Sequence, residues 1–187
     1  MSESGKQFSG ILEGGTRVYR QIVRVVDGVA RGLAIVGGLL LVGVIALTCI
    51  SIAGRALVPL GIGLGPIRGI YDMTEIAMAA AIFAFLPWAQ LTEAHARVDL
   101  FRPVMPKVFN RALDLLFNFG MFVVALVGAW RLYLGMQDKL AYGEITLIAQ
   151  IPVWQGFATA LVGAVGFVIV AAFCVVRSGR RLAGLPD

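Results

Sequence analysis

Charged residues are scarce in this chain. Asp, Glu, Lys and Arg make up 14% of its 187 residues, whereas a soluble domain contains about 25%. Hydrophobic residues reach 59%, and the mean hydropathy is +0.86. This composition excludes an ordinary soluble domain and predicts an integral membrane protein with one compact domain.

Potential metal and haem ligands are equally scarce. The chain has one histidine, His95, and two cysteines, Cys49 and Cys174. A single histidine cannot supply a bis-histidine haem site, and no Cys/His cluster has the spacing of a metal site. The two cysteines are expected in opposite leaflets, too far apart for a disulfide. The sequence therefore predicts no cofactor, no metal site and no catalytic residue.

Four long apolar runs dominate the remaining sequence. They cover residues 33–53, 70–91, 113–136 and 153–176. Each is long enough to cross the hydrocarbon core of a bilayer, which is about 30 Å thick. We expect an all-α membrane domain over residues 32–177, with four transmembrane helices in a bundle, and a cytoplasmic tail over residues 178–187.

The first 31 residues have a different pattern. Apolar residues recur at helical spacing from Phe8 to Val29, and four arginines share the opposite side, at positions 17, 20, 24 and 31. This pattern predicts an amphipathic helix over residues 1–31 that lies at the inner membrane surface. The alternative is a cytosolic extension packed on the bundle. A cleavable signal peptide is not expected, because the first long apolar run begins only at Leu33.

The distribution of Lys and Arg predicts the topology. Five lie before the first run, two in the first loop, four in the link 91–114, one in the third loop and three in the tail. Because cytoplasmic loops carry the excess of positive charge, we expect both termini and this link in the cytoplasm. The net charge of +5 is thus attributed to topology and not to nucleic-acid binding.

The link 91–114 is the most charged interior passage. Its acidic and basic residues alternate at Glu93, His95, Arg97 and Asp99. If the helix continues, the pairs Glu93–Arg97 and His95–Asp99 are each four residues apart and can interact. No serine or cysteine nucleophile accompanies the histidine, so we expect a membrane-surface anchor or a subunit contact rather than catalysis.

Two ionisable residues lie inside the apolar runs, Glu75 in the second and Arg131 in the third. An isolated charge near the middle of a bilayer costs about 2.5–3.5 kcal/mol, and less near the interface. We expect the two residues to pair with each other or with a partner subunit. A proton or ion relay is the alternative, although relays usually need several such groups.

Several short motifs occur in a fixed order relative to the four runs. They are Glu75, His95-Ala-Arg-Val-Asp99, Pro106, Arg111-Ala-Leu-Asp114, Gly143-Glu-Ile-Thr146 and Ile151-Pro152-Val-Trp154. By their order and spacing, residues 30–176 resemble the small membrane subunit, of the DctQ type, of tripartite ATP-independent periplasmic (TRAP) transporters. The resemblance implies a non-enzymatic subunit. Together with the charges inside the apolar runs, it leaves these structural or partner-contact candidates: Glu75, His95, Arg97, Asp99, Arg131, Pro152 and Trp154.

The same resemblance implies the partners and the location. They are a large multi-span permease subunit, which carries the solute with sodium, and a periplasmic solute-binding protein, which delivers an organic acid or a similar solute. The small subunit is expected to brace the large one in the bacterial inner membrane, in contact with lipids and with both termini cytoplasmic.

Two other classes of function remain open from the residues. A four-helix membrane anchor of a respiratory complex would need haem ligands or a quinone pocket, and the single histidine argues against it. A small exporter acting as a homo-oligomer would need an essential membrane carboxylate, for which Glu75 is the only candidate.

Overall fold

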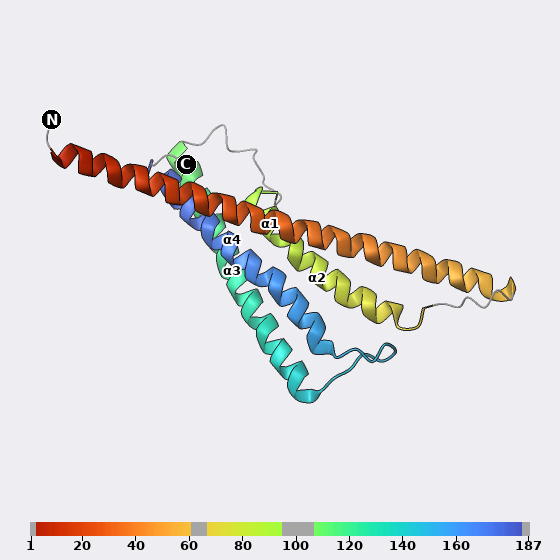
Figure 1. Cartoon of the computed structure of the whole chain (residues 1–187). Coiled ribbons are helices and arrows are strands. Elements are labelled where there is room, and N and C mark those ends of the chain that lie inside the picture. Colours follow the sequence, from red (N-terminus) through yellow and green to blue (C-terminus); the bar gives the residue numbers. More distant parts are fainter. Residues whose placement is uncertain (1–2, 61–66, 95–106, 185–187) are drawn as a thin grey trace.

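The computed structural model describes residues 3–60, 67–94 and 107–184, and it contains four long helices (Figure 1). They are α1 (Glu3–Leu57), α2 (Ile70–Leu91), α3 (Lys107–Tyr142) and α4 (Val153–Leu182), with a short 3₁₀ helix η1 (Val58–Leu60) after α1. All four are long and apolar enough to cross a membrane. The expectation of an all-α membrane protein with four spans is confirmed.

The first helix, α1, is continuous over 55 residues. The expected separate amphipathic helix over residues 1–31 is therefore wrong, because that segment runs without a break into the span at 33–53. No proline occurs before Pro59, and a single glycine costs a helix interior only about 1 kcal/mol. The helix ends just ahead of Pro59, since a residue that precedes proline is disfavoured in helical conformation.

Part of the apolar stripe in the N-terminal segment of α1 packs on α4. Val26 and Ala30 are buried in a core cluster to which α4 contributes Val170, Phe173 and Cys174. The arginines of the opposite side are exposed wherever the side chains are described, at Arg20, Arg24 and Arg31. The alternative of an extension packed on the other helices agrees with this buried part of the stripe, whereas Ile22, Val23 and Val29 of the same stripe remain exposed.

The bounds of the other helices follow the apolar runs to different degrees. α2 covers 70–91, as predicted. α3 and α4 are longer than the predicted spans 113–136 and 153–176. Hydropathy marks the part of a helix that crosses lipid, and the backbone can continue its hydrogen bonding through the polar residues beyond it.

The helices lie side by side in the order α1, α2, α4, α3 and splay apart toward one end (Figure 1). α4 packs against all three other helices, whereas α3 runs close to α4 alone among the described residues. The four helices thus form an open fan, which differs from the bundle that we expected because α1 and α3 have no contact with each other in the described structure. α1 and α3 are its two edges.

Small residues allow the close approach of helices in the centre of the fan. A Cβ atom on Gly163 of α4 would lie 2.6 Å from the carbonyl carbon of Phe83 in α2. A Cβ atom on Gly37 of α1 would lie 3.1 Å from the Cβ atom of Ala84. Backbones can approach this closely only where side chains are absent or very short.

Candidate functional site

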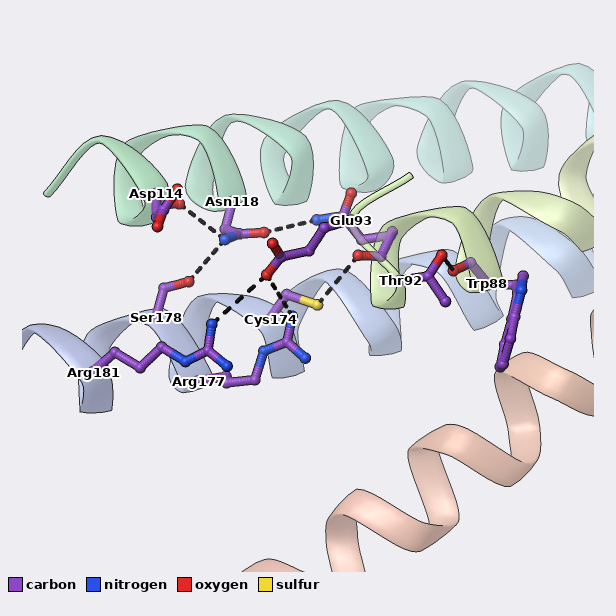
Figure 2. Close-up of polar contacts among 10 residues, drawn as sticks. Trp88, Thr92, Glu93, Asp114, Asn118, Cys174, Arg177, Ser178 and Arg181 are labelled. Carbon is purple, nitrogen blue, oxygen red and sulfur yellow. Dashed lines mark hydrogen bonds and ion pairs between the residues drawn. The ribbon is translucent and has the colours of Figure 1, made fainter. Parts of the chain in front are cut away.

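A network of uncharged polar side chains joins α2, α3 and α4 near the end at which α4 terminates (Figure 2). The Gln90 Nε2 atom donates to Asn118 Oδ1 at 2.9 Å. The Asn118 Nδ2 atom donates to Ser178 Oγ at 2.7 Å and to the Asp114 carbonyl oxygen at 2.9 Å. Gln90, Asn118 and Ser178 are buried, so these bonds replace hydrogen bonds to water. We call these three side chains the Asn118 network.

Beside this network, α2 ends in an unusual turn. The Ala94 N–H donates to the Ala89 carbonyl and the Glu93 N–H donates to the Gln90 carbonyl, a pair of bonds typical of the Schellman motif. The residue at its left-handed position is Glu93, with φ of 56°. Glycine usually occupies this position because other residues are strained there. A specific contact of the Glu93 side chain is therefore expected to compensate.

The Glu93 carboxylate makes that contact with α4 (Figure 2). Its Oε1 atom lies 3.1 Å from Arg177 Nη2 and 3.8 Å from Arg181 Nη1. The Arg177 and Glu93 side chains are 16% and 30% exposed, so water screens this ion pair only in part. The pair fixes the end of α2 and the start of the link 91–114 on α4.

At the same end of the molecule, an aromatic residue of α1 contacts α4. The Arg180 guanidinium carbon lies 4.2 Å from the centroid of the Tyr19 ring, within the range of cation–π attraction. The Tyr19 ring also stacks on Phe173, with the ring centroids 6.2 Å apart. All four helices are therefore connected at this end by side chains.

The chemistry of this region is structural. Its members are amides, a hydroxyl and an ion pair, and the described residues contain no group of three possible metal ligands. Among the described residues, the buried atoms Gln90 Oε1 and Arg177 Nε have no hydrogen-bond partner. Polar side chains that bond across helices hold transmembrane segments in register, and this is what the arrangement can do.

The start of α2 is held at the opposite end of the fan by the loop between α3 and α4. Asp72 Oδ2 accepts hydrogen bonds from the backbone N–H groups of Ile148 at 3.1 Å and Ala149 at 2.8 Å. Gly69 precedes α2 with φ of 76°, and a Cβ atom there would lie 2.6 Å from the Ala149 Cβ atom. The loop and the helix start therefore form one packed unit.

The loop 143–152 also has its own internal bonds. The Thr146 N–H donates to the Ile151 carbonyl at 2.9 Å, and the Ile151 N–H donates to Thr146 Oγ1 at 3.0 Å. Ile145 and Pro152 form an antiparallel bridge. Leu147 at the tip is 98% exposed. The loop thus presents an apolar tip on a well-defined backbone.

We expect the change Asp72→Ala to loosen this loop, because two backbone N–H groups lose their acceptor. Amide hydrogen exchange at Ile148 and Ala149 should become faster in the purified protein. The change Asp72→Asn is the matched control, since its side-chain oxygen can still accept both bonds and should preserve most of the protection. Equal exchange rates in all three proteins would show that the Asp72 side chain does not hold the loop.

The two charged residues predicted inside the spans are not brought together. Glu75 on α2 and Arg131 on α3 are both exposed, and α4 lies between their helices. No ion pair joins them in the described part of the chain. The expected mutual pairing is therefore absent, and the contact with a partner subunit and the relay stay as untested predictions.

The other predicted residues divide into two groups. His95, Arg97 and Asp99 lie outside the described residues. Pro152 is the residue before α4, where it pairs with Ile145, and Trp154 is half-buried in the first turn of α4. Pro152 thus closes the loop and precedes the helix, which its fixed φ and its missing N–H permit.

Sequence reasoning missed the Asn118 network and Asp72. Gln90 and Asn118 carry a signal that could have found them, because uncharged polar residues inside apolar runs usually face another helix. Ser178 lacks such a signal, since a serine in a basic tail is common. Asp72 resembles an ordinary acidic residue in the first turn of a helix, where it suits the helix dipole.

Comparison with known protein families agrees with this structure. Residues 44–183, most of the chain, match the family described as tripartite ATP-independent periplasmic transporters, DctQ component. No curated protein and no solved structure matches the chain. The matched region contains α2, α3 and α4 with the Asn118 network, the Glu93 ion pairs and the Asp72 loop. The chain therefore belongs to the DctQ family and is the small membrane subunit of a TRAP-type solute uptake system.

Proposed function

We propose that this subunit braces the large multi-span permease subunit of its transporter during ion-coupled uptake of an organic acid or a similar solute. A periplasmic solute-binding protein delivers the solute to that assembly. The observation that carries the proposal is the family match over residues 44–183, because members of this family are non-enzymatic transporter subunits.

The exposure of the edge helices supports a bracing role. In the most apolar part of each span, 50% of the α4 residues are buried in the chain, compared with 11% in α3 and 6% in α1. A helix with so little burial contacts lipid or another membrane protein along most of its length. The fan thus offers broad membrane-facing surfaces to a large partner.

The polar groups of the spans also favour a structural role over a transport pathway through this subunit. The buried side chains Gln90, Asn118 and Ser178 bond to one another at one end of the fan. Transport pathways instead usually contain ionisable residues that face a cavity within the membrane. The solute path therefore belongs to the large subunit in this proposal.

The topology proposed for the subunit follows the distribution of Lys and Arg along the chain. An even number of spans leaves both termini on one side, and the positive-inside rule assigns that side to the cytoplasm. The protein is then a multi-pass inner-membrane protein with its Asn118 network near the cytoplasmic surface. His95, Arg97 and Asp99 would lie at that surface, where they can contact the partner or lipid headgroups.

Affinity purification tests the function directly. An affinity-tagged form of this chain, extracted from native membranes with a mild detergent, should retain a many-span membrane protein. Deletion of its gene should abolish solute uptake, and the intact gene should restore it. Normal uptake in the deletion strain, or purification of this chain without any membrane partner, would refute the bracing role.

A further inference from the structure

One carboxylate in the fan faces outward from a membrane span. Glu75 lies five residues into α2, about 7 Å along the helix from its start. Its side chain is exposed, and the described residues supply no hydrogen bond or ion pair to it. Around it, at helical spacing, are the exposed side chains of Tyr71, Met78 and Ile82. We call these four residues the Glu75 face.

Two other sides of α2 pack against helices of the same chain. Ala84 lies against Gly37 of α1, and Ile76 lies against Gly156 of α4. α3 runs close to α4 alone among the described residues and cannot cover this face. The Glu75 face is therefore directed away from the rest of the fan.

The charge of Glu75 indicates what covers this face. A carboxylate within an apolar stripe of a span is unfavourable against lipid, and such residues in membranes usually pair with an opposite charge. Arg131 does not provide that charge within the chain. A recess of about 180 Å³ lies beside the face, between α1 and α2, and is lined in part by Arg55, Tyr71 and Thr74. An incoming helix could place a side chain there.

We propose that the Glu75 face binds a transmembrane helix of the large permease subunit, and that this helix carries a lysine or arginine at the depth of Glu75. The inference rests on the bracing function proposed above, and it adds which surface makes the contact and which charge the partner supplies. Apolar side chains of that helix pack on Met78 and Ile82, and its cation pairs with the Glu75 carboxylate.

Cysteine cross-linking in the intact complex tests the surface. The exposed Cys49 is first changed to serine, and Met78→Cys is then introduced into the tagged subunit. The matched control is Val162→Cys, an exposed residue of α4 that lies outside the Glu75 face. A short photoactivatable cross-linker attached to the new thiol should join the subunit to its large partner from position 78 and not from position 162.

Charge substitution tests the second half of the proposal. The change Glu75→Lys should lower the yield of co-purified large subunit by about tenfold or more, because a like charge replaces the pair. Glu75→Gln should lower it less, since the amide can still accept a hydrogen bond. The level of the subunit itself, measured by the tag, should change little because no contact within the described chain is lost.

Three results would overturn the inference and leave the function standing. They are cross-linking to the large subunit from position 162 alone, a cross-link between two copies of this chain from position 78, and a normal yield of complex with Glu75→Lys. If the unmodified subunit does not retain a large partner at all, the bracing function itself is wrong. The two failures are thus distinguishable.

Discussion

The change Gly163→Ala is expected to lower the free energy of unfolding by about 1–3 kcal/mol, the range typical of overpacking in a tight core. The added methyl group would lie 2.6 Å from the carbonyl carbon of Phe83 and 2.7 Å from its oxygen. Both atoms belong to the α2 backbone, so no side-chain rotation can make room. α2 and α4 must move apart, which loosens the packed contact between them at Gly163 and Phe83.

The control for this substitution is Gly128→Ala on α3. No atom lies within 4 Å of the position that a Cβ atom on Gly128 would take, so alanine introduces no clash there. Alanine is also the better helix former by about 1 kcal/mol. Thermal or denaturant unfolding in detergent should therefore show a clear loss for position 163 and no loss for position 128. Equal effects would show that α2 and α4 are not in contact at position 163.

The change Glu93→Ala is expected to destabilise the protein by about 1–3 kcal/mol, somewhat less than the loss of one partner in a fully buried ion pair. It removes the carboxylate that lies 3.1 Å from Arg177 and 3.8 Å from Arg181. The Arg177 side chain is only 16% exposed and would keep its charge in a poorly hydrated position. Alanine also keeps the strained left-handed backbone without the compensating contact.

A second ion pair provides the matched control. Lys139 and Glu144 are 33% and 46% exposed, and exposed pairs usually contribute less than about 1 kcal/mol. Glu144→Ala should therefore lower the unfolding midpoint much less than Glu93→Ala. A double-mutant cycle with Arg177→Ala separates the pair energy from other effects of Glu93→Ala. Simple additivity of Glu93→Ala and Arg177→Ala would contradict the proposed coupling of α2 to α4.

The number and type of the helices could be predicted because apolar runs report directly on lipid-crossing segments. α2 was predicted within its observed bounds 70–91, since a glycine-rich loop and a charged link flank its apolar run. The continuity of α1 was not predicted. An amphipathic segment and an apolar run differ in composition, but no residue between 29 and 33 obliges a helix to stop.

The packing and the candidate site were harder to predict. The open fan depends on which small residues lie at contacts between helices. The sequence contains many small residues that lie at no such contact. Gly38 and Gly43 have no close neighbours, whereas Gly37 lies directly against α2. The Asn118 network joins residues 28 and 60 positions apart in the chain. Such pairs follow from tertiary structure and leave no local pattern.

The two edge helices, α1 and α3, are connected only through the helices between them in the described structure, and this arrangement leads to a genetic prediction. α1 and α3 have no contacts with each other in the described structure, and each packs against α4. Substitutions on the two edges should therefore combine additively, whereas changes within α4 should interact with both. Suppressor mutations for a defect on one edge are accordingly expected in α2 or α4, and not on the far edge.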